Sequence, residues 1–251
     1  MSAPCVLVFG GLDPSGGAGI LADAEAIRQI GARPLCVATA LTVQTTRAVK
    51  RWEPVSAALV TESAHALLSE ENVRAIKIGM IADGKIAEAI ARLLAPRRDL
   101  PVVIDPVLQA SSGTLLFKGS LQQARDAYLS LASHALITPN LLEASALLEL
   151  PRQPQDAAGL EAAARAIVAK GVRAALVKGG HLAGDPVDVL AMGGAVEHFP
   201  GSRLRGTARG TGCRLSSAIA AGLALERSIR ESVVAARELV RGHLTQAAAQ
   251  R

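Results

Sequence analysis

The chain has 251 residues, 50% of which are hydrophobic, and its formal net charge is +5 at pH 7. This length suits one large α/β domain, and we expect a single domain over residues 1–251 because no linker divides the sequence. With one Trp, one Tyr and three Phe, the chain offers few aromatic platforms for stacking bases. Its Lys and Arg residues are scattered, so we expect no nucleic-acid partner, and a basic balance equally suits phosphorylated small molecules.

Cysteine usage and hydropathy indicate where the protein works. Cys5, Cys36 and Cys213 are too few and too dispersed for a disulfide framework, which predicts a reducing, cytoplasmic setting. The N-terminus enters an apolar segment without a basic region or a cleavage site, and no charge-free apolar run reaches about 18 residues, so we expect no secretion and no membrane partner. The five His residues show no ligand spacing, so a structural zinc site has no support.

Short apolar segments alternate with longer helical patterns over the first two thirds of the chain. We expect strands at residues 5–10, 33–41, 75–80, 102–105, 135–138 and 174–178. Apolar residues at helical spacing predict helices at residues 20–30, 55–68, 85–94, 120–131, 141–148 and 160–169. This alternation indicates an α/β fold with a mainly parallel sheet and helices on both faces.

The pattern changes after residue 178. Apolar segments at 187–192 and 195–199 flank a Gly-Gly pair, which supplies the positive φ angles of a tight turn, so we predict a short β-hairpin over residues 187–199. This hairpin either contributes to a lid or subunit interface or forms an ordinary sheet edge. Helices at residues 211–225 and 229–248 are expected to close the chain.

The segment Gly210-Thr211-Gly212-Cys213 stands directly before an apolar helical pattern. Its glycines let the backbone turn closely around a charged group, and the free amides of the following helix point at that group, which suits a phosphate. Cys213 stands at the mouth of this turn as a side chain that could take a proton. The structural alternative is a Gly-rich helix entry with an inert, buried cysteine.

Other polar motifs fall where predicted strands end, and the carboxyl ends of parallel strands share the sheet edge where ligands bind. The first strand leads into a glycine-rich loop, residues 10–19, and a helix that carries Asp23. Gln44 follows the second strand and offers both a donor and an acceptor to the edge of a heterocycle. Met80 ends the third strand and either covers one face of a planar ligand or belongs to the core.

The later strands end in charged or amide side chains. Asp105 either holds Mg²⁺ through water or caps a turn. Asn140 and Glu143 have capping-box spacing, which explains both locally, although the same carboxylate also suits a site beside a metal and a triphosphate. Lys178 is a compact cation suited to phosphate, or else an exposed lysine at a strand end.

Taken in order, these motifs resemble those of hydroxymethylpyrimidine and phosphomethylpyrimidine kinases, which are thiamin-pathway members of the ribokinase superfamily. The resemblance runs from about Val6 to Ala236, and its most specific segments are GLDPSGGAGILAD, ALTVQTT, KIGMIAD, VIDPV, LITPNLLEA, VKGGH and GTGC. It implies a ribokinase-like fold and an enzyme that uses ATP and Mg²⁺. The implied substrate is 4-amino-5-hydroxymethyl-2-methylpyrimidine, its monophosphate, or both.

The resemblance also implies roles for particular residues. Those lining the pyrimidine pocket would be Gly11, Asp23, Gln44 and Met80, and those serving Mg²⁺ and the nucleotide phosphates would be Asn140, Glu143 and Lys178. To these we add Asp105 beside Glu143 as a metal ligand and Arg209 as a nucleotide-binding residue. The anion hole would be formed by Gly210, Thr211 and Gly212. Cys213 would stand where most ribokinase relatives place an aspartate base, with its thiolate favoured by the helix N-terminus.

The sequence departs from the family pattern at Thr45, where Asn is common, at Arg209, where His is common, and at Arg214, where a small polar residue is common. The two guanidinium groups are expected to flank the anion hole and either to strengthen phosphate binding or to alter the accepted substrate. A pyridoxal or pyridoxine kinase is the alternative within the superfamily, and a non-catalytic pyrimidine-binding regulator is the alternative outside enzymes. Whether subunits pair as a homodimer is left open by the sequence.

Overall fold

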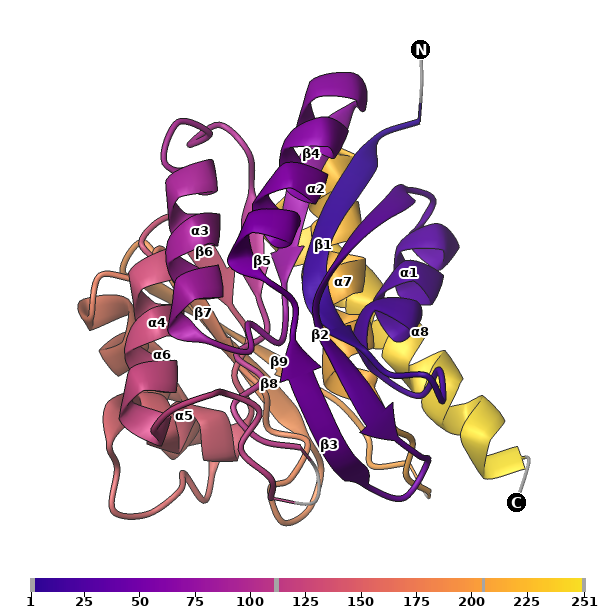
Figure 1. Ribbon diagram of the computed structural model, residues 1–251. Coiled ribbons are helices and arrows are strands. Elements are labelled where there is room, and N and C mark those ends of the chain that lie inside the picture. The colour runs from indigo at the N-terminus through magenta and orange to yellow at the C-terminus, as the bar shows by residue number, and fades with distance from the viewer. Residues whose placement is uncertain (1–2, 111–112, 205, 250–251) are drawn as a thin grey trace.

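The computed structural model describes residues 3–110, 113–204 and 206–249. Within these residues one mixed sheet is built from parallel strands β1 (Cys5–Leu12), β2 (Arg33–Gln44), β4 (Val73–Ile78), β5 (Val102–Ile104), β6 (Ala135–Ile137) and β7 (Ala174–Val177), and from strands antiparallel to a neighbour, β3 (Val49–Pro54), β8 (Val187–Met192) and β9 (Ala195–Pro200). The strand order is β3-β2-β1-β4-β5-β6-β7-β8-β9 (Figure 1).

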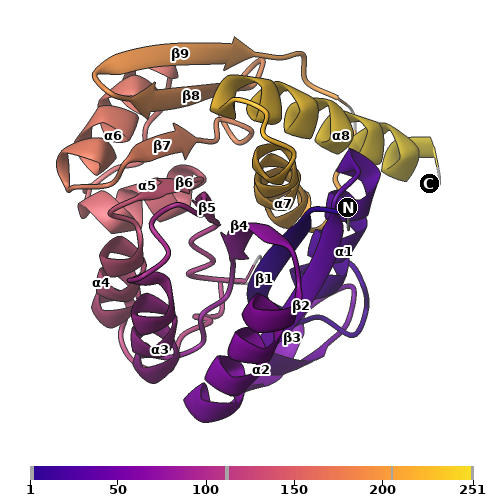
Figure 2. The same ribbon diagram turned by 90° about the horizontal axis from the view of Figure 1, so that it is seen from above.

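Helices cover both faces of the sheet. One face carries α2 (Ala57–Glu70), α3 (Gly84–Leu94), α4 (Leu121–Leu131), α5 (Leu141–Leu148) and α6 (Ala157–Ala169), and the other carries α1 (Gly19–Ile30), α7 (Thr211–Ala224) and α8 (Ile229–Ala249). Figure 2 shows α7 lying between the sheet and α8. None of the helices in the described part of the chain is long and apolar enough to cross a membrane.

Successive residues of the parallel strands face opposite layers of the core. Leu7 and Phe9 of β1 belong to the cluster under α2 to α6, whereas Val6 and Val8 belong to the cluster under α1, α7 and α8. Because side chains alternate along a strand, a strand buried on both faces must be apolar throughout. Burial on both faces therefore explains the uninterrupted apolar segments of the sequence. The predicted mainly parallel sheet with helices on both faces is confirmed.

The predicted hairpin over residues 187–199 is also confirmed. β8 and β9 pair antiparallel, and Gly193 and Gly194 join them with φ angles of 57° and 83°, a turn that favours glycine. The pair forms one edge of the sheet, in agreement with one of the two interpretations, and a part in a lid or subunit interface stays a prediction. The single domain expected over residues 1–251 likewise stays a prediction.

Strand β3 was not predicted, and β2 continues three residues beyond its expected end at residue 41. β3 carries Lys50, Arg51 and Glu53, and it pairs antiparallel with the end of β2 as the outermost strand of the sheet. An edge strand rich in charged residues lacks the apolar signal that identified the buried strands. Together β2 and β3 extend beyond the body of the sheet beside the ends of the parallel strands (Figure 1).

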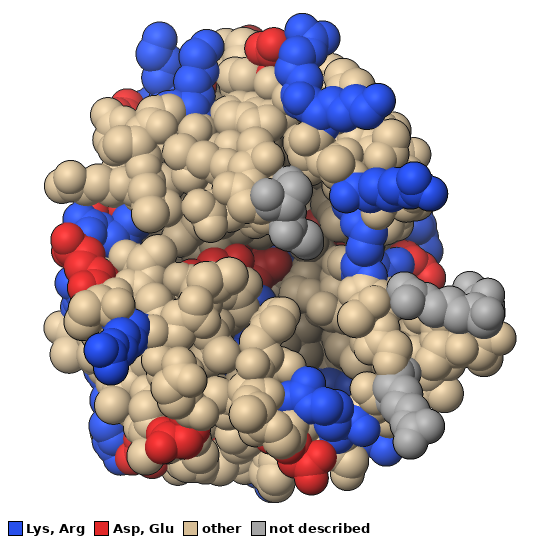
Figure 3. Space-filling view, turned by 90° about the horizontal axis from the view of Figure 1, so that it is seen from below, with Lys and Arg blue, Asp and Glu red and all other residues tan. Residues whose placement is uncertain are grey.

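The carboxyl ends of the parallel strands lie at one end of the molecule, the lower end in Figure 1. Loops from six strands therefore meet there. Figure 3 views this end and shows a hollow between the loops, with acidic side chains visible in its depth. This is the edge at which ligands bind in open α/β sheets.

Substitution of Gly179, which directly follows β7, would measure how tightly this edge of the sheet is packed. A Cβ added to Gly179 would lie 1.9 Å from the Val187 carbonyl oxygen and 2.9 Å from Leu160 Cδ1, whereas one added to Gly180 would meet nothing within 4 Å. Gly179→Ala should therefore lower the free energy of unfolding by about 1–3 kcal/mol. Gly180→Ala, the matched control, should change it by less than about 0.5 kcal/mol. Urea denaturation measures both, and equal midpoints would contradict the packing argument.

Candidate active site

The turn before α7 meets the end of β7 at the sheet edge. Lys178 donates to Asp105 at 2.8 Å, and the Asp105 carboxyl is buried. A Cβ added to Gly212 would lie 3.2 Å from Lys178 Nζ and 3.5 Å from Asp105 Oδ2. The structure therefore brings the predicted anion turn, a cation and a carboxylate together.

Gly210 shapes the entry into α7. Its φ of 68° is in the left-handed region, and a Cβ there would lie 2.3 Å from the Gly17 carbonyl oxygen, so a larger residue does not fit. Gly210 is the N-cap residue and has no side chain with which to cap the helix. The amides of Thr211 and Gly212 in the first turn are thus suited to an anion.

Asn140 and Glu143 form the capping box at the start of α5. The Glu143 amide donates to Asn140 Oδ1 at 2.9 Å, and the Asn140 amide donates to Glu143 Oε2 at 2.8 Å. Burial, together with the charge of Asp105, raises the pKa of Glu143 even though Lys178 lowers it. Although burial lowers it, the charges of Asp105 and Glu143 raise the pKa of Lys178. This corner therefore brings one cationic side chain together with two carboxyl groups.

This donor set fits a magnesium ion that arrives with a nucleotide. No group of three or more His, Cys, Asp or Glu side chains that could hold a metal by themselves occurs in the described residues. Mg²⁺ is usually held by one or two carboxylates together with phosphate oxygens and water. Asp105 and Glu143 offer two carboxyl groups as oxygen ligands, and a pocket of about 310 Å³ adjoins Asn140, Glu143 and His181.

The thiol of Cys213 does not have the lowered pKa that was expected from the sequence. Burial, with smaller contributions from Asp23 and Asp105, raises the pKa of the thiol to about 12, although the charge of Lys77 and a hydrogen bond from the Gly19 backbone lower it. The expectation that the helix N-terminus favours a thiolate is therefore corrected for the free protein. Loss of water is the largest contribution to the raised pKa of Cys213, and the carboxylates of Asp23 and Asp105 add to it.

A buried ion pair that the sequence did not indicate lies beneath this turn. Lys77 in β4 donates to both carboxylate oxygens of Asp23 at 2.9 Å, and Ser217 of α7 donates to Asp23 Oδ1 at 2.8 Å. Both charged side chains are almost completely inaccessible. Asp23 thus joins α1, β4 and α7, and its expected contact with the pyrimidine stays a prediction.

Gly11 and Met80 lie against each other. A Cβ added to Gly11 would be 2.8 Å from Met80 Sδ, and the Thr39 hydroxyl donates to the Met80 carbonyl oxygen. Met80 is buried within the apolar core. The core interpretation of Met80 is therefore correct, and its part in covering a planar ligand stays a prediction.

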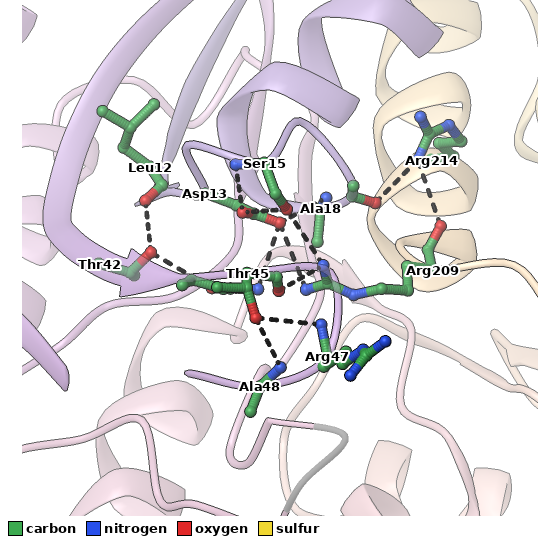
Figure 4. A network of polar contacts seen from close by, with 12 residues as sticks. Leu12, Asp13, Ser15, Ala18, Thr42, Thr45, Arg47, Ala48, Arg209 and Arg214 are labelled. Carbon is green, nitrogen blue, oxygen red and sulfur yellow. Dashed lines mark hydrogen bonds and ion pairs between the residues drawn. The ribbon is translucent and has the colours of Figure 1, made fainter. Parts of the chain in front are cut away.

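Gln44 and Arg209 both reach Asp13 in the β1–α1 loop. Gln44 Nε2 donates to Asp13 Oδ2 at 3.2 Å, and Arg209 Nη2 donates to the same oxygen at 3.3 Å. Arg209 Nη1 also donates to Ser15 Oγ and to the Thr45 carbonyl oxygen (Figure 4). The guanidinium of Arg209 is therefore directed toward the predicted pyrimidine side. The sequence had assigned Arg209 to the nucleotide instead.

Arg214 is not a free cation at the anion hole. Its side chain is buried, and its guanidinium donates to Glu25 Oε2 at 2.6 Å and to the Gly17 carbonyl oxygen at 3.2 Å. Carboxylates and backbone oxygens engage both guanidinium groups, so the expectations that Arg209 and Arg214 strengthen phosphate binding or alter the accepted substrate stay predictions. A sequence motif places a side chain near a turn but does not give its direction.

The predicted anion turn, a lysine and two carboxyl groups lie together at the ligand edge of a parallel sheet, an arrangement suited to phosphoryl transfer. The sequence model of the phosphomethylpyrimidine kinase family matches residues 13–250. A hydroxymethylpyrimidine/phosphomethylpyrimidine kinase of Streptomyces coelicolor is 40% identical and covers 98% of this chain and 90% of its own. The chain belongs to the phosphomethylpyrimidine kinase family, and the prediction of a kinase is confirmed.

Solved structures support the same fold. A phosphomethylpyrimidine kinase from Clostridium difficile aligns with a TM-score of 0.80 at 31% identity, covering 98% of this chain and 99% of that one. A Bacillus subtilis pyridoxal kinase in complex with ADP aligns with a TM-score of 0.84 at 27% identity, covering 94% and 90%. The predicted ribokinase-like fold is therefore confirmed.

The raised pKa of Cys213 has a direct chemical consequence. Below the pKa the thiolate fraction grows with pH, so alkylation of Cys213 by iodoacetamide should speed up about tenfold per pH unit between about pH 8 and pH 10. Peptide mass spectrometry of the ligand-free protein separates Cys213 from Cys36 and measures each rate. A rate that has already levelled off at about pH 8 would show that the helix N-terminus prevails after all.

Proposed function

We propose that the protein transfers the terminal phosphoryl group of Mg-ATP to 4-amino-5-hydroxymethyl-2-methylpyrimidine, to its monophosphate, or to both, on the route to thiamin diphosphate. The single observation that supports this proposal is the position of Gly212 in the first turn of α7, where an added Cβ would lie 3.2 Å from Lys178 Nζ and 3.5 Å from Asp105 Oδ2. The names of the relatives supply the class of substrate.

Catalysis of phosphoryl transfer depends on positioning the reactants and neutralising charge more than on covalent chemistry by the protein. The amides of Thr211 and Gly212 would donate to the transferring group, and Lys178 would contact the nucleotide phosphates. Asp105 and Glu143 would hold Mg²⁺, which offsets the triphosphate charge when bound with ATP. Asn140 would keep the Glu143 carboxylate in place through the capping box.

The acceptor would bind on the other side of the α7 turn. Gly11 and Met80 would line its pocket, and Gln44 would hydrogen-bond its ring edge, because an amide both donates and accepts. A site that hydrogen-bonds an aminopyrimidine discriminates against rings that lack its donors. This argument favours the aminopyrimidine over pyridoxal, although a pyridoxal kinase has a similar fold.

Cys213 is our proposed acceptor of the hydroxyl proton. Its raised pKa opposes this role in the free protein, partly through the charge of Asp105. Neutralisation of Asp105 in the loaded enzyme would remove one of these opposing contributions. Phosphoryl transfer through a loose transition state also needs little base assistance, so a partial thiolate is compatible with turnover.

The setting of the enzyme follows from the same proposal. Its partners would be the pyrimidine and ATP, with no nucleic acid and no membrane. All three cysteines are free, which agrees with the cytoplasmic location that we propose. A homodimer stays a prediction.

The reaction itself is tested by offering the alcohol, its monophosphate and pyridoxal separately with Mg-ATP. Mass spectrometry should find phosphorylated product from at least one pyrimidine and little product after chelation of the divalent cation. Product from pyridoxal alone would replace the proposed substrate. No product from any acceptor, with folded protein and saturating Mg-ATP, would refute the proposed function.

The role of Cys213 is tested by Cys213→Ala. If the thiolate is the base, turnover should fall about 10²-fold to 10⁴-fold while nucleotide affinity is kept, the usual contribution of a positioned acid or base. Cys36→Ala on β2 is the matched control and should retain turnover. Normal turnover of Cys213→Ala at saturating pyrimidine would remove Cys213 from the mechanism and leave the kinase intact.

A further inference from the structure

Asp13 is a buried carboxylate that the proposed mechanism does not use. It is 2% exposed, and its Oδ1 accepts from the Ser15 amide at 2.9 Å and from the Ser15 hydroxyl at 2.7 Å. Its Oδ2 accepts from the Ala18 amide at 3.0 Å, Gln44 Nε2 at 3.2 Å and Arg209 Nη2 at 3.3 Å. One side chain therefore joins three segments that are far apart in the sequence: the β1–α1 loop, the end of β2 and the turn before α7.

The bond to Gln44 fixes which way its amide faces. A carboxylate oxygen only accepts hydrogen bonds, so the amide nitrogen of Gln44, and not its oxygen, must face Asp13. The Thr42 hydroxyl lies 3.2 Å from Gln44 Oε1 and 2.8 Å from the Leu12 carbonyl oxygen, so it does not oppose this orientation. Asp13 thereby decides where Gln44 presents its donor and where it presents its acceptor.

The bond to Arg209 reaches the other half of the site. Arg209 immediately precedes Gly210 in the anion turn, and its guanidinium crosses to Asp13, Ser15 and the Thr45 carbonyl oxygen (Figure 4). The side chain of Arg209 is 32% exposed, whereas that of Asp13 is 3% exposed. Because hydrogen bonds to a buried, charged acceptor are stronger than those between neutral groups, this contact restrains the turn.

We propose that Asp13 is a positioning residue that couples the acceptor pocket to the anion hole, through Gln44 on one side and Arg209 on the other. This inference rests on the proposed function for the identity of the acceptor. It makes two separate statements: Asp13 sets the preference of Gln44 for an aminopyrimidine, and Asp13 with Arg209 holds two loops together. The first concerns specificity, and the second concerns the order of the backbone.

The first statement is tested with Asp13→Asn, which keeps the shape of the side chain. An asparagine must turn its NH₂ group toward the donors on one side or the other, so the orientation of Gln44 is no longer imposed. The ratio of kcat/KM for the aminopyrimidine to that for its 4-oxo analogue should fall at least about fivefold, and kcat/KM for the aminopyrimidine at least about tenfold. If Asp13 had only a structural role, the substitution would lower kcat/KM for both substrates by the same factor and leave their ratio unchanged.

Arg209→Gln and the double variant separate the two branches. Arg209→Gln should lower kcat for both pyrimidines by similar factors and leave their ratio near that of the wild type. The double variant should be no more than about twofold worse than Asp13→Asn, since residues that act through one contact are not additive. Arg92→Gln, which removes an exposed ion pair on α3, is the control and should match the wild type. Fully additive losses, or an unchanged ratio in Asp13→Asn, would overturn the inference.

Hydrogen exchange tests the second statement without any substrate. Asp13→Asn should speed amide exchange at residues 206–213 as well as at residues 13–19, and Arg209→Gln should speed it at both segments. Exchange that rises only around the substituted residue would overturn the coupling. If the wild type phosphorylates no pyrimidine, the proposed function fails while the exchange result still decides whether Asp13 joins the loops.

Discussion

The site depends on a close backbone contact between the β1–α1 loop and the turn that begins α7. Gly210 approaches the Gly17 carbonyl oxygen so closely that a Cβ atom would lie 2.3 Å from it. This approach allows Arg209 to reach Asp13 and places Gly212 beside Lys178 and Asp105. A bulkier residue at Gly210 would separate the loops and therefore both halves of the site.

Buried charge is concentrated around this contact. Lys77 and Asp23 form a nearly inaccessible ion pair under the turn, and Lys178 and Asp105 form a second pair at its mouth. Burying charges is costly, and removing one partner leaves the other uncompensated, so such pairs are better evidence of specified geometry than of stability. Here they connect α1, β4, β5, β7 and α7 at the edge where phosphate would bind.

The sequence predicted those features that follow from periodicity and from the rule that ligands bind at strand ends. The apolar strands and most candidate residues were found in this way, whereas the charged edge strand β3 gave no apolar signal. Lys77 and Asp13 were not singled out, since their meaning depends on distant partners. Asp13 meets Gln44 across 31 residues and Arg209 across 196. The directions of Arg209 and Arg214 likewise followed from packing that no local pattern encodes.

The burial of α7 limits where this enzyme can adapt. Every residue from Arg214 to Gly222 is buried, and a Cβ added to Gly222 would lie 2.5 Å from Ser232 Oγ of α8, so the helix is clamped between two layers. A clamped helix keeps its N-terminal amides in one place whichever acceptor arrives. Changes of acceptor during evolution would therefore accumulate in the surrounding loops, while the N-terminal end of α7, where we propose that phosphate binds, would stay constant.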